Sequence, residues 1–288
     1  MCGRFAAFRE AQDLADAFGV EIDDVAPDAL ALPPSWNIAP TDPVRIVVER
    51  AERTGRAGRD GERDAGRDGG RDGGRDGGRD GSRAGGSEKP ADRAPRRSLR
   101  LARWGLVPGW ASDPSVGARM INARYETLDT KPAFRKALAA RRCLVPAEGY
   151  FEWTEPAPGA PRGTPRTPHW IHRADGGPLA FAGLYEFWRD RGRADDDPLR
   201  WLVSTTIVTG AAWTADPAVA ALHDRRPVVL DPARWDAWLD PALDGAAALP
   251  LLRDAPPTLV ATSVSTAVNR VGTQGPGLVE PVTAQPAG

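Results

Sequence analysis

One segment of the chain has nothing to contribute to a hydrophobic core, and it constrains the fold more than any other feature. Residues 51–97 are rich in Gly, Arg and Asp, contain no apolar residue larger than Ala or Pro, and carry an Arg-Asp pair at every fourth position from Arg59 to Arg79. A period of four could place these pairs on one helix face, but each interleaved Gly costs a helix about 1 kcal/mol. We therefore predict a disordered loop whose charges largely neutralise one another.

Strand-like sequences flank this segment on both sides. Residues 44–48 and 99–104 have the apolar content of β-strands, so the segment would connect two strands of one domain. Such a long connection is tolerable, because the entropic cost of closing a loop grows only logarithmically with its length. We expect one domain over residues 1–288, interrupted by the insert at 51–97.

The remaining patterns favour strands over helices. Helical signals occur at residues 10–18, 130–138 and 231–239. Strand-like runs are more numerous and occupy residues 143–145, 150–153, 179–188, 201–208, 227–230 and 259–264. Because strands and helices do not alternate regularly, we predict an α+β fold: a mainly antiparallel, barrel-like β-sheet with a few peripheral helices.

Composition excludes several classes of protein. Of the 288 residues 41% are hydrophobic, which suits a globular protein, and no apolar run is long enough to span a membrane. The start of the chain has no apolar signal region and there are only two cysteines, so we expect a cytoplasmic protein with no membrane partner. No Cys/His set has metal-ligand spacing, and we expect neither a metal nor a cofactor. The net charge of −1 gives no bulk support for nucleic-acid binding, which must rest on the placement of individual residues.

The second residue can take part in a reaction that an internal cysteine cannot. Removal of Met1 would leave Cys2 with a free amine and a thiol on neighbouring carbons. The amine can add to an aldehyde to give a Schiff base, and the sulfur can then close a five-membered thiazolidine, a step that high effective molarity favours. Taken alone this signal is weak, because many chains begin with Met-Cys by chance.

Three further segments carry polar groups in suggestive positions. Asn122 lies in a short stretch with a cation and a carboxylate, Glu148 stands between a Pro turn and an apolar strand, and His223 precedes two arginines. Partial desolvation would raise the pKa of Glu148 towards that of a general acid, and neighbouring arginines disfavour the imidazolium form of His223. Each residue also has an ordinary structural interpretation, as a turn residue or a surface group. His169 and His172 look like residues on the surface of a strand.

Taken together, these segments resemble a known family. The chain contains MCGR at residues 1–4, WNIAPT at 36–41, RWGLVPGW at 103–110, NARYET at 122–127, PAEGYFEW at 146–153 and HDRRP at 223–227. These motifs, in this order, resemble the SRAP domain of the SOS response-associated peptidases, which are abasic-site processing proteins. The late pairs at 264–265 and 268–269 are similar to the closing segment of that family.

The resemblance implies a function and a role for each matching residue. Cys2, once Met1 is removed, would form a thiazolidine with the ring-opened sugar of an abasic site in single-stranded DNA, shielding the lesion from strand cleavage. Asn122 would orient the linkage, Glu148 would shuttle protons, and His223 would assist opening of the sugar ring and reversal of the crosslink. The resemblance also implies self-removal of Met1, a peptidase activity, and a weak AP-lyase side reaction through the Schiff base.

The resemblance further implies how DNA would be held. Arginine side chains match phosphate-binding positions of the family, and three tryptophans fall in motifs near its DNA groove; these residues are Arg4, Arg124, Arg225, Trp36, Trp104 and Trp110. Arginine forks suit phosphate oxygens, and aromatic rings suit unpaired bases. We expect a monomer that is cytoplasmic and associated with the nucleoid when bound to DNA.

Two departures and two alternatives remain open. Arg226 stands where the family has Met, and would either lower the pKa of His223 or add a phosphate contact. The Arg-Asp-Gly insert is also atypical. An N-terminal cysteine nucleophile amidohydrolase would use the Cys2 thiol against an amide, usually on a four-layer αββα sandwich. A non-catalytic nucleic-acid-binding module would leave Cys2, Glu148 and His223 without a role.

Overall fold

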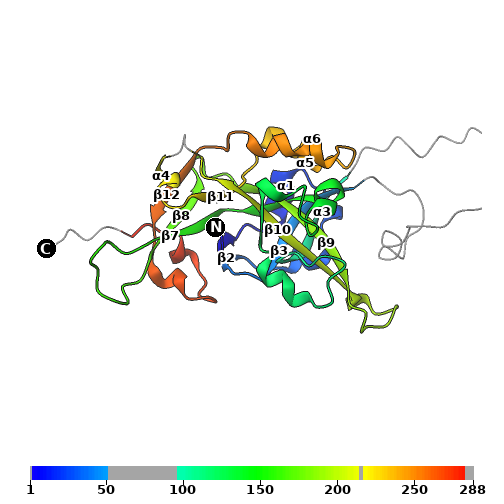
Figure 1. The fold of residues 1–288 in the computed structure, drawn as a ribbon, viewed down its shortest axis with the longest axis horizontal. Helices are drawn as coiled ribbons and strands as arrows, with labels where there is room; N and C mark the ends of the chain where they lie inside the picture. Colours follow the sequence, from blue (N-terminus) through cyan, green and yellow to red (C-terminus); the bar gives the residue numbers. More distant parts are fainter. Residues whose placement is uncertain (1, 51–95, 214–216, 283–288) are drawn as a thin grey trace, which may run out of the picture.

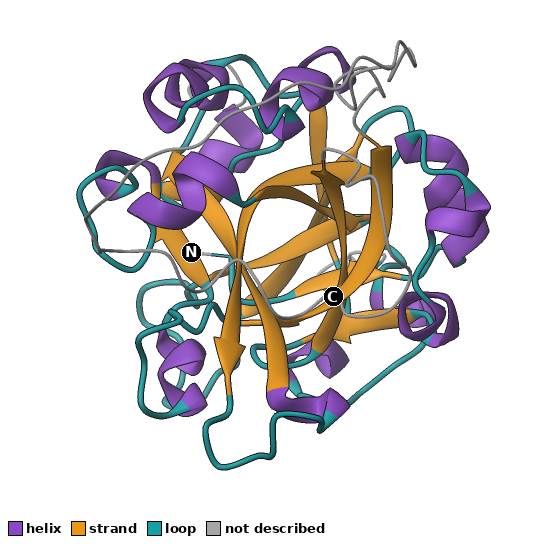
Figure 2. Ribbon diagram, turned by 90° about the vertical axis from the view of Figure 1, so that its right-hand side faces the viewer, coloured by secondary structure: helices purple, strands orange, loops and turns teal. Residues whose placement is uncertain are grey.

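The computed structural model describes residues 2–50, 96–213 and 217–282 (Figure 1). Its centre is a five-stranded barrel, visible as the ring of strands in Figure 2. In ring order its strands are β10 (Trp201–Ala211), β4 (Arg96–Trp104), β3 (Pro43–Arg50), β6 (Arg142–Ala147) and β9 (Leu179–Arg189). Pairing of β9 with β10 closes the ring, and every pairing in it is antiparallel except the parallel contact of β4 with β10.

Two short strands extend the barrel beside β10. β11 (Arg225–Pro227) pairs with it antiparallel, and β5 (Asn122–Arg124) pairs with it parallel. In the latter register Asn122 lies opposite Ile207, a fully buried residue. Strand β10 therefore brings together two segments of the sequence that are about a hundred residues apart, each carrying candidate site residues.

A second sheet packs beside the barrel, on the left in Figure 1. Its antiparallel strands, in spatial order, are β12 (Leu259–Ser263), β8 (Thr167–Arg173), β7 (Gly149–Thr154), β1 (Phe5–Ala7) and β2 (Ser35–Ile38). Only Glu148 separates β6 of the barrel from β7 of this sheet. The next residue must be Gly149, because a Cβ atom there would lie 2.5 Å from the carbonyl oxygen of Ile171.

Two of the three buried hydrophobic clusters of the described residues pack around the barrel. One fills the barrel, where Phe5 packs edge-on against Trp104 and Phe181, with ring centroids 5.0 and 5.9 Å apart. The other lies between the barrel wall and the helices around it, seen at the periphery of Figure 2. Helix α1 (Ala11–Phe18) shows why: its buried residues recur on one face, and it ends at Gly19 in the left-handed conformation with φ 65°.

The other helical segments are short. The α-helices are α2 (Pro27–Ala31), α3 (Arg135–Ala140), α4 (Pro217–Ala220), α5 (Trp235–Leu239) and α6 (Gly245–Ala248). The 3₁₀ segments are η1 (Ile22–Asp24), η2 (Pro114–Arg119), η3 (Tyr125–Thr127), η4 (Pro198–Arg200), η5 (Pro232–Arg234), η6 (Leu249–Arg253), η7 (Thr266–Asn269) and η8 (Pro276–Leu278). None of the helices in the described part of the chain has the length and apolar character needed to cross a membrane.

The α+β fold class with a barrel-like, mainly antiparallel sheet is confirmed. Most of the insert, residues 51–95, lies outside the described residues, so its predicted disorder stays a prediction. Arg96 and Arg97 belong to β4, which begins before the predicted strand at 99–104. Likewise the strand expected at 227–230 ends at Pro227, after which the chain stays extended and Val228 donates a hydrogen bond to the carbonyl oxygen of Val208.

Candidate functional site

Cys2 lies just before β1, with its side chain fully buried among residues of the barrel cluster. Its thiol donates a weak hydrogen bond to the carbonyl oxygen of Arg4, with Sγ and oxygen 3.8 Å apart. Burial raises the pKa of the thiol far above its ordinary value, and the charge of Glu152 raises it further. A thiol in this environment needs a nearby base before it can act as a nucleophile.

Asn122, at the start of β5, is brought directly against Cys2. Its side-chain amide donates a hydrogen bond of 2.7 Å to the carbonyl oxygen of Cys2. The other polar atom, Oδ1, is buried and has no hydrogen-bond partner among the described residues. A buried acceptor without a partner costs free energy unless a ligand or a reacting group satisfies it. The structure thus places Asn122 against Cys2, and the role of Asn122 in orienting a linkage stays a prediction.

Glu148 is not brought to Cys2, and its proposed role needs correction. Its Oε2 accepts a hydrogen bond of 2.6 Å from the backbone N–H of Phe8, and its Oε1 lies 3.1 Å from Nε of Arg9. Both oxygens are thus engaged where the chain passes from β1 towards α1. Burial raises the pKa of Glu148, but the geometry ties this carboxylate to the corner between the sheets.

Glu152, four residues further along, takes the position that sequence reasoning gave to Glu148. It lies in β7 and is 5% exposed. Its negative charge raises the pKa of the Cys2 thiol, and the charge of Asp224 in turn raises the pKa of Glu152. Burial raises the pKa of this carboxyl to about 7. At neutral pH it is therefore divided between acid and base forms, as a proton shuttle requires. The sequence feature that indicates Glu152 is a carboxylate inside the apolar strand GYFEW. Burying a charged group costs free energy, so a carboxylate there suggests a function.

His223 stands immediately before β11, held by its own motif. Its Nδ1 accepts a hydrogen bond of 2.9 Å from the backbone N–H of Arg225 and lies 2.7 Å from Oδ1 of Asp224. Burial is the main cause that lowers the pKa of His223, and the charge of Arg225 lowers it further. The ring is then neutral at pH 7, and the tautomer in which Nδ1 accepts from Arg225 carries its proton on Nε2. Because the charge of Asp224 also reaches Glu152, this motif lies beside the Cys2–Glu152 pair.

The three arginines expected to hold phosphates are in different states. Arg124 is exposed at the end of β5. Arg4 donates through Nη1 to Oδ1 of Asn37 at 2.7 Å and to the carbonyl oxygen of Val268 at 3.1 Å, so it binds the closing segment of the chain. Arg225 forms a bidentate ion pair with the carboxylate of Glu126.

The three tryptophans also differ, and one of them is corrected. Trp104 is completely buried, donates from Nε1 to the carbonyl oxygen of Ile121 at 2.9 Å, and packs on Phe5 inside the barrel. It cannot stack on a nucleic-acid base. Trp110 is 66% exposed, and Trp36 is partly exposed and stacked on Phe8 with ring centroids 5.4 Å apart. These two rings remain candidates for DNA contacts.

Substitution should separate the roles of Trp104 and Trp110. Trp104→Ala is expected to lower the free energy of unfolding by about 3–5 kcal/mol, because it empties the barrel interior. Trp110→Ala is expected to change it by less than about 0.5 kcal/mol, since the ring faces solvent. If Trp110 stacks on a base, the same variant should weaken binding of single-stranded DNA by about 1–3 kcal/mol. Denaturant unfolding and fluorescence anisotropy measure the two effects; a fully stable Trp104→Ala would contradict the assignment.

Arg226, the departure from the family motif, faces inward. Its side chain is buried, with the guanidinium 5.5 Å from the ring centre of Trp213 and Nη1 donating to the carbonyl oxygen of Pro227. A buried guanidinium is not offered to a DNA phosphate. Of the two arginines, Arg225 is the one whose charge lowers the pKa of His223.

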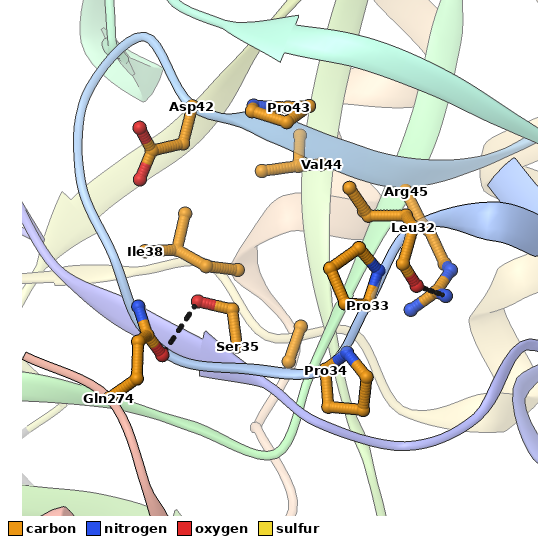
Figure 3. Close-up of a pocket in the computed structure, with 11 residues that line it drawn as sticks. Leu32, Pro33, Pro34, Ser35, Ile38, Asp42, Pro43, Val44, Arg45 and Gln274 are labelled. Carbon is orange, nitrogen blue, oxygen red and sulfur yellow. Dashed lines mark hydrogen bonds between the residues drawn. The ribbon is translucent and has the colours of Figure 1, made fainter. Parts of the chain in front are cut away.

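A pocket of about 250 Å³ opens elsewhere, between β2 and the start of β3 (Figure 3). Its wall is mostly apolar, with a polar corner where Ser35 Oγ donates to Oε1 of Gln274 at 3.2 Å. None of the candidate reactive groups lines it: the lining residues are Ala7, Leu32, Pro33, Pro34, Ser35, Ile38, Asp42, Pro43, Val44, Arg45 and Gln274. The chemistry is therefore concentrated at the buried start of the chain and not in this pocket.

Comparison with known sequences now decides the family. The profile of the family described as "SOS response associated peptidase (SRAP)" matches residues 1–271. The chain belongs to the SRAP family. All of the residues that converge on Cys2 fall within the SRAP match, and so do both arginine-bearing motifs.

Curated SRAP relatives share about a third of their residues with this chain. The abasic site processing protein YoqW of Bacillus subtilis is 31% identical over 241 residues, which cover 84% of this chain and 81% of that protein. The abasic site processing protein YedK of Escherichia coli is 34% identical over 182 residues, covering 62% of this chain and 73% of that protein. A crystal structure of a Bacteroides thetaiotaomicron protein superposes with a TM-score of 0.67 at 20% identity, covering 98% of this chain and 100% of the other, and so shares the fold.

The candidate residues of the SRAP site lie in the part of the chain that the structure describes. There, no cluster of three or more His, Cys, Asp or Glu side chains is arranged to hold a metal ion. Both cysteines are free thiols, and Cys143 is buried in the barrel wall, with Sγ 3.5 Å from Oγ1 of Thr205.

Proposed function

We propose that this SRAP protein processes abasic sites in DNA by forming a covalent bond between Cys2 and the ring-opened sugar. The observation that carries the proposal is a fully buried Cys2 whose carbonyl oxygen accepts a hydrogen bond from Asn122. The charge of the buried Glu152, whose own pKa is raised to about 7, acts on the Cys2 thiol. Support for the substrate comes from YoqW and YedK, which are named abasic site processing proteins. The protein thus acts as an enzyme on a DNA lesion.

The reaction begins once Met1 is removed and Cys2 has a free α-amine. Asn122 fixes the carbonyl of Cys2, and its Oδ1, which has no hydrogen-bond partner among the described residues, is available to accept a hydrogen bond from the amine. The amine adds to the C1′ aldehyde of the open sugar to give a carbinolamine. Loss of water from that carbinolamine gives the Schiff base, and the protonated form of Glu152 supplies the proton that the leaving hydroxyl requires.

Ring closure completes the linkage. The carboxylate of Glu152 takes the proton of the Cys2 thiol, whose pKa is raised by burial, and Sγ attacks the imine carbon. Glu152 then passes the proton that it took from the thiol to the imine nitrogen, and a thiazolidine forms with no change in oxidation state. Because Sγ and nitrogen belong to the same residue, the step is intramolecular and strongly favoured.

His223 supports the earlier opening of the sugar. Its Nδ1 accepts a hydrogen bond from the backbone N–H of Arg225, and in that tautomer Nε2 carries the N–H. Directed at the ring oxygen of the sugar, this donor would stabilise the charge that develops as the bond to C1′ breaks. The proposed removal of Met1 by the same site and a weak lyase reaction through the Schiff base would use the same groups.

Recognition would involve the DNA backbone and the missing base. The protein carries a net charge of −1, so phosphate contacts must come from individual arginines such as Arg124 and Arg225. An abasic nucleotide presents no base edge, and exposed rings such as Trp110 suit the bases beside it. We propose a single-stranded partner, a monomeric protein, and a cytoplasmic location with the protein on the nucleoid when bound to DNA.

One pair of oligonucleotides tests the proposal. A single-stranded oligonucleotide with one true abasic site is expected to give a band that resists heat and SDS on a denaturing gel. The same oligonucleotide with a tetrahydrofuran analogue, which cannot open to an aldehyde, is expected to give none. Equal adducts with both, or none with either, would overturn the proposal. Turnover of small amides without an adduct would point to the amidohydrolase, although the closed barrel is not the αββα sandwich usual for that class.

A further inference from the structure

The guanidinium of Arg225 is already occupied by an acid of the same chain. Nη1 donates to Oε1 of Glu126 at 3.0 Å and Nη2 donates to Oε2 at 3.0 Å, which is a symmetric bidentate ion pair. Nη2 also donates to the carbonyl oxygen of Thr209 at 2.9 Å. The remaining edge offers little, because Nε is buried, without a hydrogen-bond partner in the described chain.

This pair blocks the edge that a phosphate would use. A phosphate accepts two parallel N–H groups from Arg in the same fork geometry as a carboxylate. Both groups are committed to Glu126, so a DNA phosphate cannot form a bidentate contact with Arg225 while the pair persists. A DNA phosphate and the Glu126 carboxylate therefore compete for the guanidinium of Arg225.

The two partners are unequally anchored. The side chain of Arg225 is 15% exposed and is held to β10 by Thr209, whereas that of Glu126 is 47% exposed. Glu126 can turn into solvent at little cost, and Arg225 would stay where it is. Hydrogen bonding to Arg225 lowers the pKa of Glu126, so the carboxylate is ionised and the pair is intact at neutral pH.

We propose that Glu126 is an internal competitor that DNA phosphate must displace from Arg225. This inference rests on the proposed function, since it assumes that Arg225 contacts DNA. In the free protein Glu126 accepts hydrogen bonds from Nη1 and Nη2 of Arg225 and so keeps the guanidinium in place. On binding, phosphate oxygens replace the carboxylate oxygens, and Glu126 is released to water.

The exchange should be visible in the salt dependence of binding. Each phosphate neutralised on a single strand releases counterions and contributes about 0.7 to the slope of log K against log salt. A displaced Glu126 regains a hydrated cation atmosphere, which offsets the release at this contact. Removing the charge of Glu126 should therefore tighten binding and also make the salt dependence steeper. A carboxylate that merely positioned Arg225 would give the opposite sign, because its loss would weaken binding.

The experiment measures binding of wild type and Glu126→Gln to a fluorescent oligothymidine without a lesion, by anisotropy from 50 to 200 mM salt. Glu126→Gln is expected to bind about 2- to 5-fold more tightly at the lowest salt, the size of one exposed ion pair. Its slope should be steeper by up to about 0.7. The matched control is Asp129→Asn, which makes the same charge change at an exposed carboxylate with no ion pair among the described residues.

The outcomes separate this inference from the function on which it rests. In an Arg225→Ala background, Glu126→Gln should lose its effect, because the two residues act through one contact. If Glu126→Gln binds no more tightly than Asp129→Asn while Arg225→Ala weakens binding, the competitor role is overturned and the proposed function stands. If the wild type neither binds nor crosslinks DNA, both are overturned. Thermal unfolding of each variant verifies that the fold is retained.

Discussion

Cys2→Ala is expected to abolish the heat-resistant adduct with an abasic site. Alanine at this position still presents an α-amine after removal of Met1, so a Schiff base can form. Without sulfur the ring cannot close, and the imine hydrolyses when the protein is denatured. Adding borohydride should trap that imine in Cys2→Ala as a stable amine, which shows that the site is intact and that the thiol alone is missing.

The second cysteine provides a matched control. Cys143 is as fully buried as Cys2 but lies in the barrel wall, with its Sγ 3.5 Å from Oγ1 of Thr205. Cys143→Ala should therefore retain the adduct, with only a packing cost to stability. Cys2→Ser should give a labile adduct, because oxygen closes a less stable ring. An undiminished heat-resistant adduct in Cys2→Ala would contradict a thiazolidine, and so would crosslinking by protein whose mass still includes Met1.

Strand periodicity explains what sequence reasoning found and where it went wrong. The apolar runs predicted the barrel strands because side chains on a strand alternate between two faces. The same rule could have been applied inside the motifs: Glu152 shares a face with the buried Tyr150, and Trp104 shares one with the buried Ala102. Applying it would have marked Glu152 as a buried carboxylate within a strand and would have placed Trp104 inside the barrel.

Strand periodicity cannot predict contacts between segments that are far apart in the sequence. Asn122 reaches Cys2 across 120 positions, and Glu126 reaches Arg225 across 99. Both contacts depend on the parallel register of β5 with β10, and no local pattern specifies a register between strands so far apart. The family resemblance supplied the first contact, because it groups residues by function. It did not supply the contact of Glu126 with Arg225, because the family resemblance assigns Arg225 to DNA and this ion pair forms in the protein without DNA.

Burial of Glu152 should make the stability of the fold depend on pH. A carboxyl whose pKa rises from 4.5 unfolded to about 7 folded binds its proton more tightly in the native state. The resulting stabilisation is fully present below pH 4.5 and is lost as the pH rises through 7, an effect on the order of 3 kcal/mol. Glutamine has no proton to lose. Glu152→Gln should therefore melt at a higher temperature than wild type at pH 8, with the difference shrinking as the pH falls towards 4.5.

The same substitution should impair catalysis while it stabilises the fold. Loss of a general acid–base group typically slows a reaction by about 10²–10⁴-fold, and we expect Glu152→Gln to slow single-turnover crosslinking by that order. The wild-type rate should show a break near pH 7, and the variant should lack it. Glu148→Gln is the matched control: it changes an equally buried carboxylate that binds Phe8 and Arg9, and should leave the crosslinking rate within a few-fold of wild type. A slow Glu148→Gln beside a fast Glu152→Gln would return the proton shuttle to Glu148, and would require the loop after β1 to move when DNA binds.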